Sequence, residues 1–328
     1  MIEKGYKRYP KKDRHIASID IGSHTARLLV ARETGSKDLF KPLFRKRAYI
    51  SLAEGFDKNG RDEISPEAIK RSLKVLDDFI RTANKYHVDV IRAVSTGVMR
   101  RAANRKPFLD LIRDKTGINV PVISGEREAH LTLKGVRHFL DIGEEASVVF
   151  DLGGGTTEFI YSQNDSVDIR SLPLGAILLT RNFLDTDPPA DYQIENLSTY
   201  VDGILKRSLP KKIHGGDILT VTGSGGTVTT VASMVNEIDL SEITPDRLNG
   251  LILKREAVEE CFSRLKKLPL SDRERLTGLD KGRAGVIPAG TMTLIRILYF
   301  LNAADMKVSY SDILEGILIS YLQGEEYE

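Results

Sequence analysis

The stretch Asp151-Leu152-Gly153-Gly154-Gly155-Thr156-Thr157-Glu158 lies between two apolar runs, residues 146–150 and 159–161, that are typical of buried strands. The chain must turn within this stretch, so the pattern predicts a hairpin. Three consecutive glycines remove every Cβ, which lets backbone N–H groups approach an anion such as phosphate closely. Asp151 and Glu158 flank the turn, and carboxylates beside a phosphate suit Mg²⁺. The same residues also fit an alternative without a binding site, a tight glycine turn with solvent-exposed acidic residues at its ends.

An earlier segment repeats this plan. Residues 15–30, HIASIDIGSHTARLLV, are typical of an apolar strand, a turn with the pattern Asp-x-Gly-small, and a second apolar strand. Two such hairpins in matching strand context indicate a duplicated domain. A third glycine-rich turn, residues 222–227, follows an apolar run at 217–221 and precedes an expected helix at 228–235. A strand, a glycine turn and a helix N-terminus together form a ready anion site.

Six sequence blocks connect these turns to a known family. They are DIGSHTARLL (20–29), TGVMRRAAN (96–104), ISGEREA (123–129), DLGGGTTE (151–158), GSGGT (223–227) and RAGVIPAG (283–290). The hairpin pair resembles the phosphate loops of the superfamily of actin, sugar kinases and heat-shock-chaperone ATPases. The six blocks, in their order, resemble exopolyphosphatases and guanosine pentaphosphate phosphohydrolases in their short, two-domain form. The resemblance implies an α/β fold with two duplicated ribonuclease-H-like (actin-like ATPase) domains, each a mixed sheet flanked by helices, and an interdomain cleft.

The expected domains combine this resemblance with the strand and helix patterns. A basic tail covers residues 1–13, the first domain covers 14–131 plus 307–328, and the second covers 132–306. In the first domain the patterns predict strands at 15–20, 26–33, 42–51, 88–94 and 120–123, and helices from Ser65 to 83, around 100–104, at 108–115 and at 131–140. In the second they predict strands at 146–152, 156–162, 167–172 and 217–222, and helices at 176–184, up to 205, at 255–267 and at 287–301. A strand at 308–310 and a helix at 312–322 follow.

Glu128 is the expected catalytic base, and this role comes from the resemblance alone. Members of the family place their proposed catalytic glutamate immediately before the alanine of the third block, which here is Glu128. Acids at the beginning of a helix ordinarily just complement its dipole, and the residues by themselves leave that alternative open. Arg100 is the second catalytic candidate, because a guanidinium can clamp a phosphate oxygen. Asn104, one helical turn further, is expected on the same face, and a basic surface helix is the alternative.

Three carboxylates and three loops complete the expected site. Asp151 and Glu158 are expected to hold Mg²⁺, or Mn²⁺ in its place, with Asp20 joining directly or through water. The remaining candidates are backbone or polar groups that would contact phosphate: Gly22, Ser23, His24, Arg27, Asn104, Gly153, Gly154, Gly155, Thr156, Gly223, Ser224, Gly225, Gly226 and Thr227.

Two residues depart from the pattern of the family. His24 stands where asparagine is usual, and Gly97 stands where alanine is usual. An imidazole can still donate a hydrogen bond to phosphate. The change at Gly97 is small in volume and is expected to affect only the backbone.

The composition of the 328 residues is that of an ordinary globular protein, with 41% hydrophobic and 29% charged residues, and the length suits two domains. No apolar run is long enough to span a bilayer, and the Lys/Arg-rich segment 1–14 lacks the apolar core of a secretory signal. That segment is expected to be a disordered tail, with a substrate-touching arm as the alternative. Cys261 is the only cysteine, which excludes a disulfide within the chain and favours a reducing cytoplasm.

The formal net charge of +2 is small, so neither nucleic acid nor a membrane is an expected partner. Local basic clusters at 45–47, 100–106, 206–212 and 266–267 can line a track for a polyphosphate chain, although each also fits a solvated face. A homodimer stays open.

The expected function is that of an exopolyphosphatase, which hydrolyses the terminal phosphoanhydride of inorganic polyphosphate and releases orthophosphate. The first alternative is hydrolysis of guanosine pentaphosphate to guanosine tetraphosphate, although no residue that would read a guanine is evident. A non-catalytic sensor of polyphosphate or guanosine tetraphosphate is the alternative from another class. A sugar or acetate kinase also stays open, whereas a chaperone-type ATPase would need a peptide-binding extension for which the chain has no room. The sequence contains no G-x-x-x-x-G-K-[ST], which argues against a P-loop enzyme.

Overall fold

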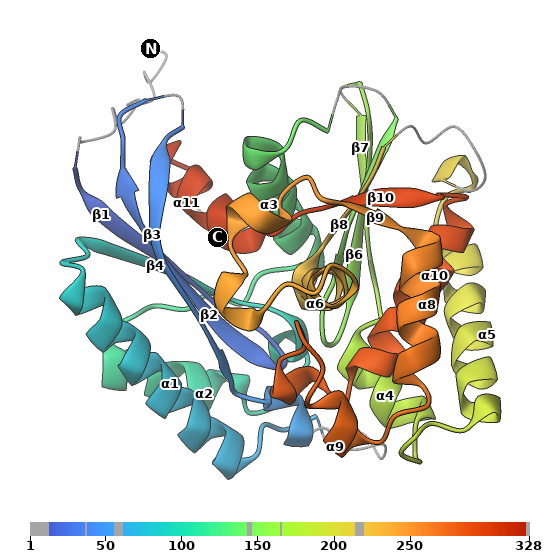
Figure 1. Ribbon diagram of the computed structural model, residues 1–328. Coiled ribbons are helices and arrows are strands. Elements are labelled where there is room, and N and C mark those ends of the chain that lie inside the picture. The colour runs from blue at the N-terminus through green and yellow to red at the C-terminus, as the bar shows by residue number, and fades with distance from the viewer. Residues whose placement is uncertain are drawn as a thin grey trace. The chain divides into compact units, whose positions relative to one another are not determined.

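The structure is a computed structural model, and it describes residues 13–36, 38–55, 62–142, 146–164, 166–213 and 220–325. The expected basic tail up to residue 12 and the expected strand residues 217–219 lie outside these ranges. The chain folds into two compact units, one made of Met1–His138 and Ile313–Glu328, the other of Phe139–Asp312 (Figure 1). The chain passes from the first unit to the second after His138 and returns to the first after Asp312. Both positions lie a few residues later than the predicted boundaries at 131 and 306.

The first unit is built on a four-stranded sheet with the order β3-β2-β1-β4. β1 (His15–Ile21), β2 (Thr25–Glu33) and β3 (Phe40–Tyr49) pair antiparallel in succession, and β4 (Val90–Ser95) pairs with β1 in parallel. These four strands confirm the predicted ones. The strand expected at 120–123 is wrong, because this segment makes only a single bridge, between Val122 and Ser95. Pro121 has no N–H group with which to extend the ladder.

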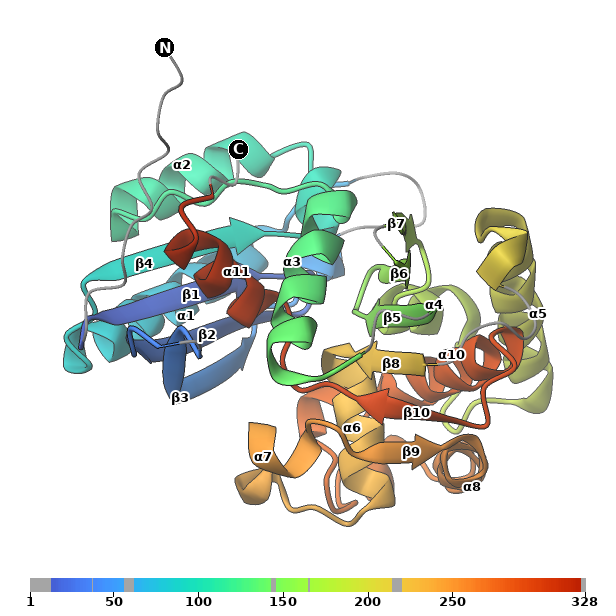
Figure 2. The same ribbon diagram turned by 90° about the horizontal axis from the view of Figure 1, so that it is seen from above.

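Helices cover both faces of this sheet (Figure 2). α1 (Pro66–Lys85) and α2 (Arg105–Thr116) pack against the larger apolar cluster, which includes Ala93 of β4. α3 (Gly125–Phe139) and α11 (Ile313–Leu322) pack against Val94, and adjacent strand residues point to opposite faces of a sheet. Sequence signals fix the ends of α1 and α2: Ser65 Oγ accepts a hydrogen bond of 3.2 Å from Ala68 N, and Gly117 adopts a φ of 71°.

The helix that was expected to carry both Arg100 and Asn104 does not form. After β4 the chain makes a short 3₁₀ turn, η2 (Gly97–Arg100), which begins at a glycine with a φ of 61°. α2 then starts at Arg105, so Asn104 precedes the helix and does not share a helical face with Arg100. A second 3₁₀ turn, η1 (Leu52–Gly55), follows β3.

The second unit repeats the sheet and extends it. Its strands are β5 (Ser147–Leu152), β6 (Thr157–Gln163), β7 (Ser166–Leu172), β8 (Thr220–Ser224), β9 (Ile252–Lys254) and β10 (Asp305–Val308). They are ordered β7-β6-β5-β8-β10-β9, and the first four match β3-β2-β1-β4 in order and in direction. The duplication predicted from the two hairpins is therefore confirmed. The strand expected at 308–310 lies earlier, at β10, and pairs with β8.

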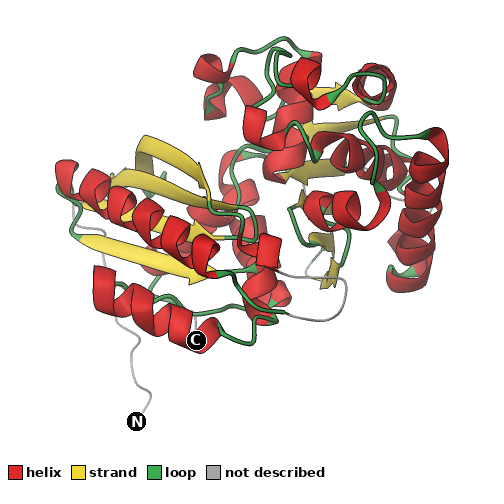
Figure 3. Ribbon diagram, turned by 90° about the horizontal axis from the view of Figure 1, so that it is seen from below, coloured by secondary structure: helices red, strands yellow, loops and turns green. Residues whose placement is uncertain are grey.

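The helices of the second unit surround one apolar helix, α10 (Ile287–Phe300). α10 is buried along most of its length and contacts α4 (Ala176–Phe183), α5 (Asp191–Ser208), α6 (Gly225–Val235) and α8 (Arg255–Leu265). In each unit the strands form a layer that is flanked by helices (Figure 3). Shorter elements are η3 (Lys211–Ile213), η4 (Leu240–Glu242), α7 (Pro245–Leu248), α9 (Leu270–Arg273) and η5 (Lys281–Arg283). Across the described ranges, no helix is both long and apolar enough to cross a membrane.

Candidate active site

Each unit carries one Asp-x-Gly hairpin, and the two hairpins close in the same way. In the first, Gly22 N donates to Thr25 O over 3.0 Å, and in the second, Gly153 N donates to Thr156 O over 3.0 Å. The aspartates Asp20 and Asp151 lie at equivalent places, near the ends of β1 and β5. The sequence repeat is thus a repeat of backbone geometry.

The carbonyl groups of the first loop accept hydrogen bonds from the backbone of the segment that follows β3. Ser23 O accepts from Ala53 N over 3.1 Å, and His24 O accepts from Ile50 N over 2.8 Å. In a trans peptide the N–H of the next residue points opposite to the carbonyl. The N–H groups of His24 and Thr25 therefore point away from the segment that anchors the loop, as an anion-binding loop requires.

The carbonyl groups of the second loop likewise accept backbone hydrogen bonds, here from the N-terminus of α4. Gly153 O accepts from Ala176 N over 3.0 Å, and Gly154 O accepts from Ile177 N over 2.9 Å. The contact is so close that a Cβ on Gly175 would overlap the backbone of Gly154. The N–H groups of Gly154, Gly155 and Thr156 consequently point away from α4, which fits the predicted phosphate cradle.

The third glycine-rich segment differs from the expected turn. Residues 222–224 continue β8, where Gly223 packs against Phe150 and Met306, and α6 begins at Gly225 rather than at 228. Gly223 therefore lies within a strand, where its lack of a side chain makes room for core groups, and its contact with phosphate stays a prediction. Ser224 and Thr227 are also buried, with Ser224 Oγ donating to Phe150 O over 3.3 Å. Gly225 and Gly226 remain at the N-terminus of α6.

Arg283 is a site candidate that the sequence reasoning missed. Its guanidinium lies against Gly226, where a Cβ would overlap it. A cation thus lies beside the first turn of α6, whose positive dipole end also favours an anion. The signal was present in the sequence, because Arg283 opens the last of the six blocks. Only the fold shows that this block returns to the third glycine segment.

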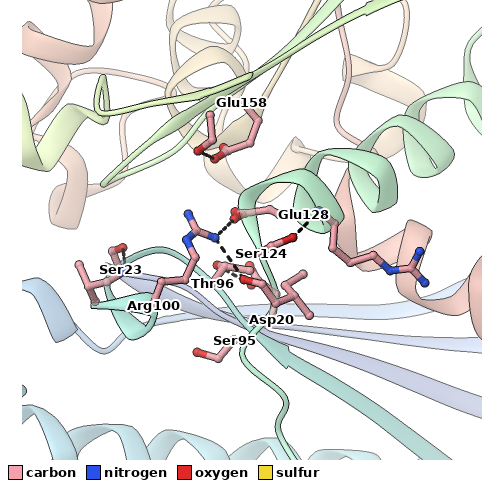
Figure 4. A network of polar contacts seen from close by, with 12 residues as sticks. Asp20, Ser23, Ser95, Thr96, Arg100, Ser124, Glu128 and Glu158 are labelled. Atoms are coloured by element: carbon pink, nitrogen blue, oxygen red, sulfur yellow. Dashed lines mark hydrogen bonds and ion pairs between the residues drawn. The ribbon is translucent and has the colours of Figure 1, made fainter. Parts of the chain in front are cut away.

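Asp20 is held by side chains of its own unit. Arg27 lies directly opposite Asp20 on the hairpin, and its Nη2 donates to Asp20 Oδ2 over 2.7 Å. Thr96 Oγ1 donates to Asp20 Oδ1 over 3.2 Å (Figure 4). The structure therefore pairs Arg27 with the carboxylate of Asp20, both of whose oxygens accept hydrogen bonds, and a contact of Arg27 with phosphate stays a prediction.

The two other expected metal ligands are neighbours across the second hairpin. Asp151 and Glu158 are directly opposite in the register of β5 and β6, and Glu158 Oε1 accepts from Ser171 Oγ over 2.7 Å. A Cβ on Gly225 would overlap Asp151 Oδ1, so the glycine leaves room at this carboxylate. Two carboxylates fit Mg²⁺, which takes one or two of them and fills its shell with phosphate and water. Within the described part of the chain, no three His, Cys, Asp or Glu side chains gather as a ready-made metal cluster.

Arg100 and Glu128 form an ion pair in the first unit. Arg100 Nη1 donates to Glu128 Oε2 over 2.6 Å, and the two side chains are 22% and 15% exposed (Figure 4). Glu128 lies in the first turn of α3, and Arg100 ends η2. The two catalytic candidates, 28 residues apart in the chain, are thus brought together.

Ser23 joins this pair to the first loop. Ser23 Oγ accepts a hydrogen bond of 3.1 Å from Val98 N, within η2. A Cβ on Gly97 would overlap that Oγ. The expectation that Gly97 affects only the backbone is therefore wrong, because the glycine also makes space for Ser23.

The side chain of Asn104 forms hydrogen bonds with the backbone of the segment before α1. Its amide Oδ1 accepts from Ile64 N over 2.9 Å, and its Nδ2 donates to Ile64 O over 2.8 Å. This pair of bonds ties the chain ahead of α1 to the start of α2. The side chain of Asn104 therefore stabilises the local fold, and the structure does not place it with Arg100.

The basic cluster at 45–47 does not form a track. Arg45 is ion-paired with Glu315 of α11, and Lys46 pairs with Asp78 of α1 over 2.6 Å on the other face of the sheet. Arg47 lies over the ring of Tyr49, 5.9 Å from its centre. The three successive cationic side chains therefore contact three different groups and do not line one track.

The fold and its duplicated hairpins define a protein of the actin-like ATPase fold. The chain belongs to the Ppx/GppA phosphatase family, whose sequence model matches residues 29–325. It is 29% identical over 323 residues to a protein of Mycobacterium tuberculosis named exopolyphosphatase 2, with 93% of this chain and 98% of the relative aligned. These matches make the protein a phosphatase-family hydrolase.

Solved structures agree with this assignment. The crystal structure of a Ppx/GppA family member from Aquifex aeolicus has a TM-score of 0.78 and 27% sequence identity, and covers 96% of this chain and 99% of its own. A structure described as an exopolyphosphatase from Cytophaga hutchinsonii has a TM-score of 0.86 and 25% identity, with the same coverage of 96% and 99%. The similarity extends over both units.

Proposed function

We propose that this protein is an exopolyphosphatase, which hydrolyses the terminal phosphoanhydride of inorganic polyphosphate and releases orthophosphate. The observation that carries the proposal is the 2.6 Å pair of Arg100 and Glu128, joined through η2 to a loop whose N–H groups point outward. The names of the relatives from Mycobacterium tuberculosis and Cytophaga hutchinsonii support the same substrate.

In the first unit, Glu128 would take the proton of the attacking water. Arg100 is at hydrogen-bond distance from Glu128 and would share its N–H donors between that carboxylate and a phosphate oxygen. The N–H groups of His24 and Thr25 would bind further phosphate oxygens. Phosphoryl transfer demands little covalent chemistry from the protein, so positioning and charge should supply most of the rate.

In the second unit, Asp151 and Glu158 would hold Mg²⁺, with Mn²⁺ as a substitute. The ion would offset negative charge on the phosphates. The N–H groups of Gly154, Gly155 and Thr156 would cradle a phosphate, and Arg283 would add a guanidinium at the start of α6. We place the reaction in the cytoplasm, because a single buried cysteine suits a reducing compartment.

The test is phosphate release with Mg²⁺ from long-chain polyphosphate, guanosine pentaphosphate and ATP, measured side by side. Release from polyphosphate above the other two, lost in Glu128→Gln, is the expected result. A preference for guanosine pentaphosphate would move the protein to the nucleotide branch of the family. Release from ATP only in the presence of a sugar or acetate would indicate a kinase. No release, with tight binding retained, would indicate a sensor.

A further inference from the structure

We propose that Arg273 is a positioning residue for Arg283, whose guanidinium it holds at the phosphate site beside α6. The inference rests on the proposed function, because it names a residue through which that site is built. Both arginines belong to the second unit, where they lie at the ends of α9 and η5 in the segment between α8 and α10.

The side chain of Arg273 carries a charge into the interior, where it is only 3% exposed. Its Nε donates to Ala284 O over 2.9 Å, and its Nη1 donates to Leu268 O over 2.8 Å. Its Nη2 is paired with Asp187 Oδ1. A buried guanidinium is costly unless its donors have partners, so these three contacts determine how the surrounding segments can lie. With these donors used inside the protein, Arg273 is placed to act through its neighbours rather than on substrate.

The contact with Ala284 is the one that leads to the phosphate site. Ala284 immediately follows Arg283 and is fully buried. Its carbonyl oxygen accepts from Arg273 only while the backbone at the end of η5 keeps its direction. The same direction determines where the Arg283 side chain leaves the backbone, and its guanidinium lies against Gly226 at the start of α6. A misplacement of about 1 Å at a binding group can cost up to about 100-fold in activity.

Asp187 binds the other side of the Arg273 guanidinium. It lies on the connection between α4 and α5, and its side chain is 40% exposed. Its Oδ2 accepts from Leu270 N over 2.6 Å, so the carboxylate contacts α9 at both its first and its last residue. A chain of contacts therefore runs from Asp187 through Arg273 to the backbone that carries Arg283.

The segment before Arg283 is attached to α6 at a second place. Gly278 has a φ of 77° and packs so closely on the last turn of α6 that a Cβ would overlap the backbone of Ser233 and Met234. The segment thus contacts the last turn of α6 at Gly278 and the first turn at Arg283. A substitution that releases Ala284 should consequently shift Arg283 without detaching the whole segment.

The experiment is a double-mutant cycle that combines Arg273→Lys with Arg283→Ala. A lysine keeps the charge, but its single ammonium does not reproduce the planar fork that serves three acceptors. Arg273→Lys should raise KM for polyphosphate about three- to tenfold with kcat within about twofold, because the loss concerns binding rather than chemistry. In the Arg283→Ala background it should raise KM less than about twofold, since the residue that it positions is gone.

Asp187→Ala extends the test to an exposed position, where the substitution leaves the core intact. It should raise KM as Arg273→Lys does, and again not beside Arg283→Ala, so the test stands even where Arg273→Lys does not fold. Asp202→Ala is the matched control, because Asp202 binds Arg296 through two hydrogen bonds of 2.7 and 2.6 Å between α5 and α10 of the same unit. It should lower the urea midpoint about as much as Asp187→Ala and leave KM within about twofold.

Four results would overturn the proposal. They are an unchanged KM in both Arg273→Lys and Asp187→Ala, an unchanged KM in Arg283→Ala, a rise in KM that is as large beside Arg283→Ala as without it, and an equal rise in Asp202→Ala. Calorimetric binding of inorganic tripolyphosphate gives the same cycle in Kd without turnover. If the wild type releases no phosphate, the proposed function fails, but a non-additive cycle in Kd would still establish the role of Arg273, and an additive one would exclude it.

Discussion

Arg100 Nη1 donates a hydrogen bond of 2.6 Å to Glu128 Oε2 and so joins the turn after β4 to the first turn of α3. The contact gives each residue a fixed partner before any substrate is present. A carboxylate held in this way is positioned to accept a proton from a nearby water, and a guanidinium with five donors can serve the carboxylate and a phosphate together.

The first prediction concerns this carboxylate. Glu128→Gln should lower kcat for polyphosphate by about 10²–10⁴, because the amide still accepts from Arg100 but cannot take up a proton. Binding of polyphosphate should persist. Glu126→Gln is the matched control, since Glu126 is exposed in the same helical turn and its variant should keep normal turnover. Normal turnover of Glu128→Gln would exclude Glu128 as the base.

The second prediction separates backbone strain from the position of Ser23. Gly97→Ala and Gly117→Ala both place a side chain at positive φ, 61° and 71°, which costs about 1–2 kcal/mol of unfolding free energy. Only at Gly97 does the new Cβ overlap Ser23 Oγ, whereas nothing lies within 4 Å at Gly117. Urea unfolding should show a larger loss for Gly97→Ala, and only that variant should raise KM for polyphosphate. Equal kinetics for the two variants would contradict the role of Ser23.

Local sequence signals predicted most of the sheets and helices. The alternation of apolar residues and the Asp-x-Gly turns located both hairpins, and Ser65 with Pro66 located the start of α1. Each of these features depends on residues close together in the chain. The two catalytic candidates required more than local signals. The resemblance of short blocks pointed to Glu128 and Arg100, and the fold shows that they are in contact.

The predictions that failed concern residues whose contacts lie far away in the sequence. Asn104 was expected beside Arg100, but its amide binds the backbone of Ile64, 40 residues earlier. Gly223 was expected in a turn, but it continues a strand because it pairs with Phe150 in the neighbouring β5. Arg283 was not chosen, because nothing near it in the chain indicates its contact with Gly226. Such contacts are decided by the tertiary fold, which short sequence patterns do not encode.

The third prediction concerns the metal. Chelation should abolish phosphate release by the wild type, and added Mg²⁺ should restore it. Asp151→Asn should lower kcat at least about 100-fold at saturating Mg²⁺, because a bound metal is worth several kcal/mol of charge stabilisation. Asp191→Asn, at an exposed position paired with Lys266, is the control and should behave as the wild type. Full activity under chelation would contradict a metal at Asp151.

The fourth prediction is a pH dependence of stability. Burial raises the pKa of the Cys261 thiol to about 11, more than the charge of Arg264 lowers it. The folded state therefore favours the neutral thiol, and its contribution is full below pH 9.0, the ordinary value, and is lost as pH rises through about 11. Across that range the free energy of unfolding should fall by about 2 kcal/mol more in the wild type than in Cys261→Ala. Parallel pH profiles of the two proteins would contradict this.

The fifth prediction tests Arg283, the residue that the fold rather than the sequence identifies. Its guanidinium lies against Gly226 at the start of α6, so we expect it to bind a phosphate oxygen there. A hydrogen bond to a charged group contributes about 1.5–3 kcal/mol, so Arg283→Ala should raise KM for polyphosphate roughly 10- to 100-fold. Lys281→Ala removes an exposed cation from the same 3₁₀ turn and should change KM less than about twofold. If the two variants raise KM equally, the effect is one of overall charge, and Arg283 has no specific contact with substrate.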